Sequence, residues 1–317
     1  MIDYLLLIIG LAILAIGGDN LVRGAVGLAE NFRVPAFIIG LTVVSIGTTL
    51  PEVFVSVNAA LDGVGGLAIG NAIGSCVANV LLVVGLMSAI RPTHCGERGL
   101  DRNALILTGI TIVFMAMLAK GRLERLDGLL LLLALGLFLL LQLRAATRHR
   151  RAQAAAAGIL HEEVGKVPHR PAAIAVMIGA GLAFLPVGAE LVVRSASAIA
   201  ARWGIGAEVI GLTVVAIGTS LPELAAGTLA AIRGRHAVAL GNVVGANIFN
   251  VGLIMGVTAG LVPIPVPGRI VGLDMWVMLA AALLVAALAH LKAVIGRPLA
   301  LAMLAAYVLY AGLSYAI

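Results

Sequence analysis

Ten long apolar runs, separated by short charged or Pro- and Gly-containing breaks, cover most of the chain. They lie at about 3–28, 34–60, 64–90, 103–119, 127–143, 171–199, 205–231, 237–263, 270–290 and 295–316. Most approach or exceed the roughly 20 residues that an α-helix needs to cross the hydrocarbon core of a bilayer. The sequence has no series of alternating segments of the β-barrel type. The pattern therefore predicts an all-α polytopic membrane protein with ten transmembrane helices.

Composition agrees with this fold class. Hydrophobic residues make up 62% of the 317 residues, charged residues make up 11%, and the mean hydropathy is +1.13. A soluble domain of this size needs far more polar surface. The net charge of +6 is not gathered in basic runs interleaved with aromatic residues, so we expect no nucleic-acid binding. The first run lacks a preceding basic segment and is predicted to be a retained helix, not a signal peptide.

Two cysteines, Cys76 and Cys95, are the only ones in the chain. One falls in a predicted helix and the other in a predicted loop, so we expect no structural disulfide. His94 stands beside Cys95, but two residues do not make a metal site.

The distribution of Lys and Arg predicts the orientation of the chain. Fifteen of the 21 basic residues fall in or beside the loops after the first, third, fifth, seventh and ninth runs, and six fall in the other loops. Cytoplasmic loops carry the excess of basic residues. We therefore expect a multi-pass protein of the cell inner (plasma) membrane with both termini outside. The longest polar connection, 144–170, is predicted to be a basic cytoplasmic tether.

Two segments of the chain repeat almost unchanged. Residues 39–52 read IGLTVVSIGTTLPE and residues 210–223 read IGLTVVAIGTSLPE, with twelve of fourteen positions identical at an offset of 171. The same offset relates G-N-A-I-G at 70–74 to G-N-V-V-G at 241–245, and Asn79 to Asn250. Agreement over separated blocks without a gap indicates an internal duplication.

Each half contains five predicted helices, so the two halves must enter the membrane in opposite directions. The predicted organisation is a first inverted repeat at 1–143, the loop at 144–170 and a second inverted repeat at 171–317. Inverted repeats are typical of secondary transporters, which bind substrate near the midplane where broken helices face one another. A channel or an intramembrane enzyme can also be duplicated, so the repeat favours transport without deciding it.

The repeated segments each carry one glutamate, Glu52 and Glu223, inside an apolar run. A carboxylate at bilayer depth costs about 3 kcal/mol or more unless it is protonated, paired or bound to a cation. Two such groups at matched positions of an inverted repeat would converge on one site. Pro51 and Pro222 lack an N–H and are predicted to break each helix. The symmetry and the charge together predict a cation between the glutamates.

Oxygen atoms surround both glutamates in the sequence. Thr48 and Thr49 precede Glu52 by four and three residues and share its helical face, as Thr219 and Ser220 do for Glu223. Ser75 and Asn79 share one face of the third run. An all-oxygen set without converging His or Cys suits calcium or sodium and argues against zinc or copper.

Structural interpretations compete at several of these positions. A proline kink flanked by threonines can be purely structural, although two matched glutamates make this less probable. The G-x-x-x-G spacings at 70–74 and 241–245 are predicted to allow close helix approach, and Asn71 and Asn242 to form interhelical hydrogen bonds. Two i,i+4 pairs are predicted to be local salt bridges: Asp19 with Arg23, and Glu190 with Arg194. Asp62 and the residues Arg233 to His236 are predicted to be solvated loop residues.

These motifs resemble the two alpha repeats of the sodium/calcium exchanger family, prokaryotic type, within the cation/calcium antiporter group. GTTLPE and GTSLPE are each followed at equal distance by G-N-x-x-G and then Asn, and the match spans nearly the whole chain. The resemblance implies two inverted five-helix halves. It also implies ion ligands from the side chains of Thr48, Thr49, Glu52, Ser75, Asn79, Thr219, Ser220, Glu223 and Asn250, and from the backbone carbonyls of Ser45 and Ala216.

The chain departs from the family pattern at three positions. Ala246 stands where prokaryotic relatives often have a serine equivalent to Ser75, which implies a weaker sodium subsite. Asn250 stands where some relatives carry Asp, which argues against potassium co-transport. Cys76 replaces the asparagine that the second repeat keeps as Asn247.

The resemblance implies a secondary active antiporter that exchanges sodium for calcium by alternating access, three Na⁺ for one Ca²⁺. The alternative is a calcium/proton antiporter that uses the same two glutamates. Calcium and sodium would be transient cargo, and no cofactor is expected. No Asp pair, Ser/His set or H-E-x-x-H motif is present, so we expect no enzyme. The expected partners are calcium and sodium ions and the lipid bilayer, with no nucleic acid, and we expect a monomer.

Overall fold

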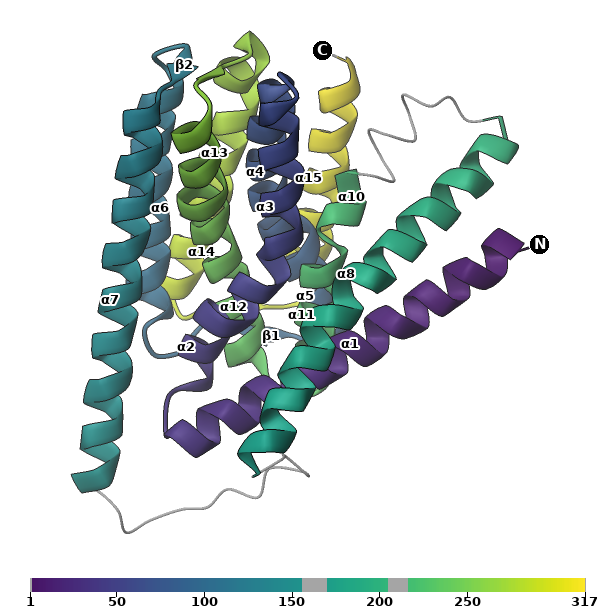
Figure 1. The fold of residues 1–317 in the computed structure, drawn as a ribbon. Coiled ribbons are helices and arrows are strands. Elements are labelled where there is room, and N and C mark those ends of the chain that lie inside the picture. The colour runs from purple at the N-terminus through teal and green to yellow at the C-terminus, as the bar shows by residue number, and fades with distance from the viewer. Residues whose placement is uncertain (1, 156–169, 205–215, 317) are drawn as a thin grey trace.

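The computed structural model describes residues 2–155, 170–204 and 216–316, and helices dominate these ranges (Figure 1). In them, eight helices are long and apolar enough to cross a membrane: Ile2–Phe32, Ala36–Leu61, Gly65–Ile90, Leu100–Leu118, Arg125–His149, Pro171–Arg202, His236–Leu261 and Ile270–His290. Two shorter apolar helices, Leu221–Ile232 and Arg297–Leu313, fall in the predicted seventh and tenth runs. The start of the seventh run, 205–215, lies outside the described residues. The polytopic helical fold class is confirmed.

Several of these spans are divided by π-helical turns or short breaks. The first half contains α1 (Ile2–Phe32), α2 (Ala36–Ile39), η1 (Gly40–Val44), α3 (Ser45–Leu61), α4 (Gly65–Ala78), η2 (Asn79–Val84), α5 (Gly85–Ile90), β1 (Thr93–His94), α6 (Leu100–Leu118), β2 (Arg122–Leu123) and α7 (Arg125–Ala155). The second half contains α8 (Pro171–Arg202), α10 (Ala216–Thr219), α11 (Leu221–Ile232), α12 (His236–Phe249), η4 (Asn250–Met255), α13 (Gly256–Leu261), β3 (Ile264–Pro265), η5 (Ile270–Asp274), α14 (Met275–His290), β4 (Val294–Ile295) and α15 (Arg297–Ala316).

Two of the π-turns, η2 and η4, start at positions that the internal repeat relates. Asn79 begins η2 and Asn250 begins η4, each directly after a regular helix. A π-turn leaves the regular i→i−4 ladder and is frequent at functional sites. The duplication is therefore visible in the backbone geometry as well as in the sequence.

Helices α1 and α8 form a long antiparallel pair that crosses the bundle obliquely (Figure 1). Their contact is unusually close: a Cβ added to Gly17 would lie 2.9 Å from the Cβ of Phe184, and one added to Gly188 would lie 2.8 Å from the backbone nitrogen of Leu14. Gly17 and Gly188 are related by the repeat offset. Small residues let membrane helices approach at this distance, and helices of 31 and 32 residues must tilt to stay within a hydrocarbon core of about 30 Å.

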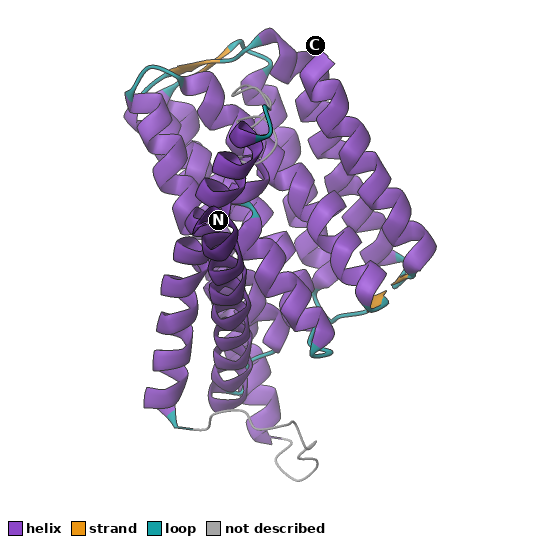
Figure 2. Ribbon diagram, turned by 90° about the vertical axis from the view of Figure 1, so that its right-hand side faces the viewer, coloured by secondary structure: helices purple, strands orange, loops and turns teal. Residues whose placement is uncertain are grey.

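Two short antiparallel ribbons join the halves, one at each end of the bundle (Figures 1 and 2). In the first, β1 pairs with β4, with Thr93 opposite Ile295. In the second, β2 pairs with β3, with Leu123 opposite Ile264. Each ribbon therefore takes one strand from each half. The loops after the third and ninth predicted helices share one end, and the loops after the fourth and eighth share the other, as opposite insertion of the halves requires.

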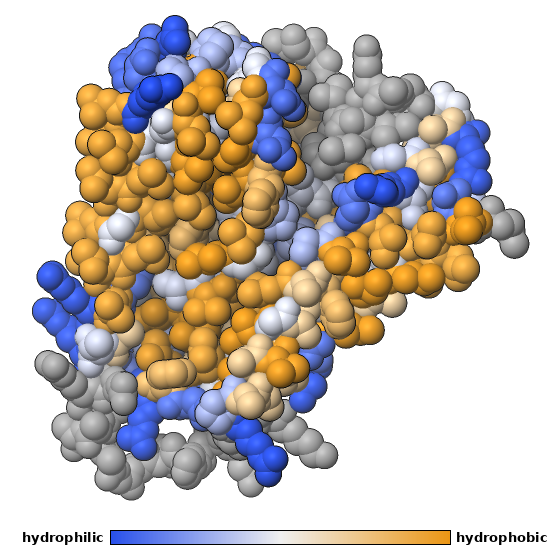
Figure 3. Space-filling model, in the orientation of Figure 1, coloured by the Kyte–Doolittle hydropathy of each residue, from blue (hydrophilic) through white to orange (hydrophobic). Residues whose placement is uncertain are grey.

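The surface is layered as a membrane protein requires. Apolar side chains cover the middle of the visible face, and polar side chains gather at its two ends (Figure 3). Burial is uneven between spans: 94% of the apolar window of His236–Leu261 is buried, against 28% of that of Pro171–Arg202. The helix that begins at His236 therefore lies at the centre of the bundle, and α8 lies at its edge.

Helix α7 extends further than the sequence predicts. The fifth run was predicted to end at 143 and to be followed by a tether at 144–170, but α7 continues to Ala155. Its 31 residues span about 46 Å at 1.5 Å per residue, more than the hydrocarbon core. The remainder of the predicted tether, 156–169, lies outside the described residues.

Candidate functional site

Glu52 and Glu223 come together in the core of the bundle. Glu52 lies in α3 and Glu223 in α11, their side chains are 1% and 0% exposed, and their carboxylates are close enough to interact electrostatically. Within the described ranges, none of their four carboxylate oxygens has a hydrogen-bond partner. Two buried like charges without partners are costly. The arrangement can hold a cation or protons, which would supply the compensating charge.

The two proline-containing segments differ in backbone structure. In the second repeat the helix is interrupted at Ser220, with φ −90° and ψ 3°, and α11 resumes with Pro222 in its first turn. In the first repeat α3 continues through Pro51, and the irregular turn is η1, upstream of Ser45. The predicted break is therefore present in the second repeat and wrong for the first. A single missing N–H at Pro51 bends or weakens a helix without ending it when the rest of the ladder is kept.

The hydroxyl groups predicted as ligands lie on the same segments as the glutamates. Thr49 and Ser220 are buried, and neither hydroxyl has a hydrogen-bond partner in the part of the chain that the structure describes. Thr48 is also buried and lies near the Glu223 carboxylate, across the repeat interface. Thr219 is half-buried at the end of α10.

The two residues predicted to act through backbone carbonyls are related by the repeat offset. Ser45 begins α3, directly after η1, and Ala216 is the first described residue of α10. The Ser45 carbonyl accepts a hydrogen bond from the Thr48 hydroxyl at 3.3 Å. The Ser45 hydroxyl lies 2.8 Å from the carbonyl oxygen of Gly40 and 3.0 Å from that of Asn242, so it links α3 to α12.

The polar residues of the third and eighth runs face the same core. Ser75 is 4% exposed, Asn79 is 0% exposed and Asn250 is 1% exposed. The Asn79 side-chain oxygen and both polar atoms of the Asn250 amide have no hydrogen-bond partner among the described residues. Helices α3 and α4 contact each other, α3 also contacts α12, and α4 contacts η4. Helix α11, which carries Glu223 and directly follows Ser220, contacts both α3 and α12, so the predicted ligands lie on helices that pack against one another.

Asn71 and Asn242 form the interhelical hydrogen bonds that the sequence predicts. The Asn71 amide donates to the Ser56 hydroxyl at 3.0 Å, and the Asn242 side-chain oxygen accepts from Thr48 at 3.4 Å. The two asparagines are equivalent in the repeat, yet only Asn242 contacts a predicted ligand. The sequence identifies Asn247 only as the counterpart of Cys76, and its hydrogen bonds to the Cys76 carbonyl and to the Asn79 amide depend on how the two repeats pack.

The G-x-x-x-G of the second repeat allows the close approach that was predicted. A Cβ on Gly241 would overlap the carbonyl oxygen of Phe37, and one on Gly245 would overlap the Ser45 hydroxyl. Gly70 and Gly74 have no neighbour within 4 Å of such a Cβ in the described ranges. The segment equivalent to α2 and η1, 207–215, lies outside those ranges.

Ion pairs surround the core without entering it. Asp19 pairs with Arg23 at 3.7 Å, and Glu190 pairs with Arg194, as predicted. Arg233 is exposed in the turn after α11, as predicted, and it also pairs with Asp19. The pairing needs the end of α11 to lie beside α1, which the local sequence does not reveal.

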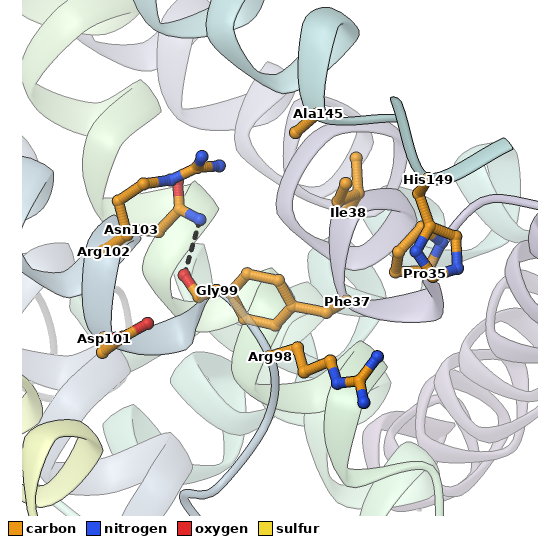
Figure 4. A pocket seen from close by; sticks show the side chains of 10 residues that line it. All are labelled: Pro35, Phe37, Ile38, Arg98, Gly99, Asp101, Arg102, Asn103, Ala145 and His149. Atoms are coloured by element: carbon orange, nitrogen blue, oxygen red, sulfur yellow. Dashed lines mark hydrogen bonds between the residues drawn. The ribbon is translucent and has the colours of Figure 1, made fainter. Parts of the chain in front are cut away.

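One open cavity of about 330 Å³ lies away from the glutamates, between α2, the start of α6 and the extension of α7. Its walls include Arg98, Arg102 and His149 (Figure 4). The two guanidinium groups point away from each other (Figure 4). No predicted ion ligand lines this cavity, and its charges do not converge.

Comparisons with known proteins agree with the geometry. The family described as sodium/calcium exchanger protein matches residues 2–144 and 173–316, one match to each half. The inner membrane protein YrbG of Escherichia coli K12 is 38% identical over 81% of this chain and 79% of its own length. The putative antiporter CaxA of Alkalimonas amylolytica is 34% identical over 89% and 88%, and the sodium/calcium exchanger MaX1 of Methanosarcina acetivorans is 28% identical over 84% and 85%.

Solved structures of the sodium-calcium exchanger NCX_Mj have the same fold. One, soaked with zero Na⁺ and Ca²⁺, superposes with a TM-score of 0.82 at 33% identity and covers 98% of both chains. Another, soaked with Na⁺ and Sr²⁺, gives a TM-score of 0.79 at 34% identity over 98% and 97%. The inverted halves, the paired glutamates and these matches over nearly the full length lead to one conclusion: the chain belongs to the sodium/calcium exchanger protein family.

Proposed function

We propose that the protein is a secondary active antiporter that exchanges sodium for calcium by alternating access. The observation that carries the proposal is the pair of buried carboxylates, Glu52 and Glu223, which interact with each other and have no hydrogen-bond partner among the described residues. Together they carry two negative charges, which one Ca²⁺ neutralises. Several Na⁺ can occupy the same oxygens and displace it.

The proposed ligands are the oxygen atoms that the predicted residues bring to this centre. Glu52 and Glu223 supply the charge, and neutral oxygens complete the coordination. The neutral ligands are Ser45, Thr48, Thr49, Ser75, Asn79, Ala216, Thr219, Ser220 and Asn250, with Ser45 and Ala216 acting through their carbonyls. Calcium and sodium are cargo in this proposal, and the chain needs no resident cofactor. All ligands come from one chain, so a monomer suffices.

Coupling follows from the cost of the empty site. Two ionised carboxylates without a bound cation have a high free energy in the dehydrated intermediate between the outward-open and inward-open states. The protein therefore switches between these states only when the site carries ions. An exchange of three Na⁺ for one Ca²⁺ would move one net charge per cycle, worth about 2.3 kcal/mol per 100 mV. The transport current should then reverse with the membrane potential.

The oblique α1–α8 pair is the proposed moving part. It packs closely within itself through Gly17 and Gly188, and α8 contributes little buried surface to the rest of the bundle. A rigid pair with a weak attachment can slide across a fixed core that holds the ions.

The proposed orientation places both termini outside the cell and the segment at 144–170 in the cytoplasm. The ribbon pairings require only that alternate loops share an end, and the excess of Lys and Arg selects which end faces inward. A tag on either terminus should be reachable from outside intact cells. Protection of both tags would reverse this orientation.

The decisive experiment is calcium uptake into proteoliposomes with sodium, proton and potassium gradients varied separately. An outward sodium gradient should drive uptake at constant pH, and uptake should depend on voltage. Uptake driven by a pH gradient without sodium would replace this proposal with calcium/proton exchange, because protons can neutralise the same two carboxylates. Calcium flux that needs no counter-ion would indicate a channel.

A further inference from the structure

The amide of Asn79 is held in one orientation by a chain of two hydrogen bonds between the repeats. Asn247 donates from its side-chain nitrogen to the backbone carbonyl of Cys76 at 3.1 Å. Asn79 donates from its side-chain nitrogen to the side-chain oxygen of Asn247 at 3.0 Å. All three residues are buried, with exposures of 2%, 2% and 0% for Asn247, Cys76 and Asn79.

The direction of this chain is fixed by chemistry. A backbone carbonyl can only accept, so the Asn247 amide must turn its nitrogen toward Cys76. Its oxygen then faces Asn79 and can only accept, so the Asn79 nitrogen must face it. The Asn79 oxygen is left free, and it has no hydrogen-bond partner among the described residues. It is a buried acceptor on the helix that packs against the glutamate-bearing α3.

The equivalent position of the second repeat lacks this chain. The offset of 171 relates Asn79 to Asn250 and Asn247 to Cys76. The Cys76 thiol donates to the Asn247 carbonyl at 3.7 Å, but sulfur is a weak acceptor and cannot hold an amide nitrogen as an oxygen does. Asn250 interacts with this thiol, but no hydrogen bond of normal geometry holds either polar atom of its amide among the described residues.

We propose that Asn247 is a positioning residue that keeps the Asn79 side-chain oxygen available to the transported cation, and that Cys76 leaves the Asn250 amide free to turn. The proposal rests on the proposed function, since it concerns the same site. The two repeats would then contribute unequally to cation affinity. The Asn79 oxygen already faces the site before the ion binds, whereas the Asn250 amide must turn its oxygen toward the ion on binding.

The orientation matters because the two ends of an amide act oppositely on a cation. The oxygen attracts it, whereas the NH₂ group repels it. Residues that orient a metal ligand typically change affinity by about 10–100-fold when they are removed. An amide whose oxygen faces the ion half of the time lowers the apparent affinity by about twofold, relative to an amide whose oxygen always faces it.

The test compares Asn247→Cys with Asn103→Cys in reconstituted protein. Asn103 is an equally buried membrane asparagine that bonds to the Gly99 carbonyl at 2.7 Å and to Gln142 at 2.7 Å, far along the chain from every proposed ligand. Asn247→Cys should raise the calcium KM by about 10–100-fold, with the maximal rate retained. Asn103→Cys should leave the KM unchanged.

The double variant Cys76→Asn with Asn247→Cys exchanges the two partners between the repeats. It should fix Asn250 where Asn79 was fixed before, and so lower the KM about twofold below that of Asn247→Cys alone. Cys76→Asn alone should lower the KM by about twofold. This variant keeps the test usable if Asn247→Cys does not fold.

The outcomes separate the two proposals. If the unaltered protein transports calcium but Asn247→Cys keeps its KM, or if the double variant matches Asn247→Cys alone, the positioning role is wrong and the antiporter proposal stands. If Asn247→Cys and Asn103→Cys lower the thermal midpoint equally and leave the KM unchanged, Asn247 is only a packing residue. If the unaltered protein shows no sodium-coupled calcium flux, the proposed function itself fails.

Discussion

The two repeats are nearly identical over their central motif, yet they do not have the same structure. In the first, α3 runs without interruption through Pro51 to Leu61. In the second, the helix is interrupted at Ser220, directly before Pro222. The motifs differ only at Ser45, which corresponds to Ala216, and at Thr49, which corresponds to Ser220. Ser45 bonds to two carbonyls, one of them across the interface, whereas its counterpart is Ala216, which has no hydroxyl.

The same contrast runs through the whole site. The first repeat supplies Ser75, and the second has Ala246 in its place. The first has an amide held by its partner repeat, and the second has an amide beside a thiol. A duplicated scaffold with unequal ligands can bind several Na⁺ and one Ca²⁺ at different subsites. The outer α1–α8 pair, in contrast, is symmetric in its close contacts. We infer that the periphery kept its symmetry and the centre lost it.

The largest expected effect is loss of transport when either glutamate is neutralised. Glu52→Gln and Glu223→Gln should each lower sodium-dependent calcium flux by at least about 100-fold, because one remaining carboxylate cannot compensate a divalent cation. Each should also raise the thermal midpoint of the ion-free protein by about 2–4 °C per kcal/mol of relieved repulsion. Flux assays and thermal unfolding check both. Glu190→Gln, an exposed partner of Arg194, should change neither; flux at the unaltered rate in either core variant would reject the site.

A smaller and symmetric effect is expected in the outer helix pair. Gly17→Ala and Gly188→Ala each place a Cβ against a neighbouring helix, and overpacking of this kind costs about 1–3 kcal/mol. Their losses in thermal stability and in transport rate should be similar, at most about tenfold in rate. Gly179→Ala, which has no described neighbour within 4 Å of its added Cβ, is the control. Strongly unequal losses would show that α1 and α8 are not equivalent.

A change of a few-fold is expected where the second repeat lost oxygen ligands. Ala246→Ser should lower the sodium concentration needed for half-maximal exchange, because it adds the hydroxyl that Ser75 supplies in the first repeat. Asn250→Asp should alter the preference between sodium and potassium, because it adds a third carboxylate to the site. Ion-dependence curves in proteoliposomes check both. Unchanged sodium and potassium dependence in Asn250→Asp would contradict the role assigned to that residue.

The smallest expected effect is a slow rate of thiol labelling at Cys95, beside the β1–β4 ribbon. Cys95 bonds through its backbone N–H to the Ala293 carbonyl at 2.9 Å, beside the β1–β4 pairing. Burial raises the pKa of the Cys95 thiol to about 11, so its thiolate fraction at pH 8 is about 100-fold below that of an ordinary thiol. A Cys76→Ala background should therefore react very slowly with a maleimide, with or without calcium. Rapid labelling during transport would show that the ribbon opens.

The sequence alone predicted the membrane spans, the internal duplication and the two core glutamates. Apolar run length identified the spans, because a helix that crosses lipid must be long and apolar. The 171-residue offset identified the duplication, and the cost of charge in lipid singled out Glu52 and Glu223. These inferences worked because each depends on local composition or on the comparison of one segment with another.

Only the tertiary structure decided which equivalent residues remain equivalent. Pro51 and Pro222 have the same neighbours in sequence, but only the second lies at an interruption. Asn71 and Asn242 match in the repeat, but one bonds to Ser56 and the other to Thr48. The physical reason is that a buried polar group takes its partner from whichever helix packs against it, and that partner is set by packing across the two halves, not by the residues on either side.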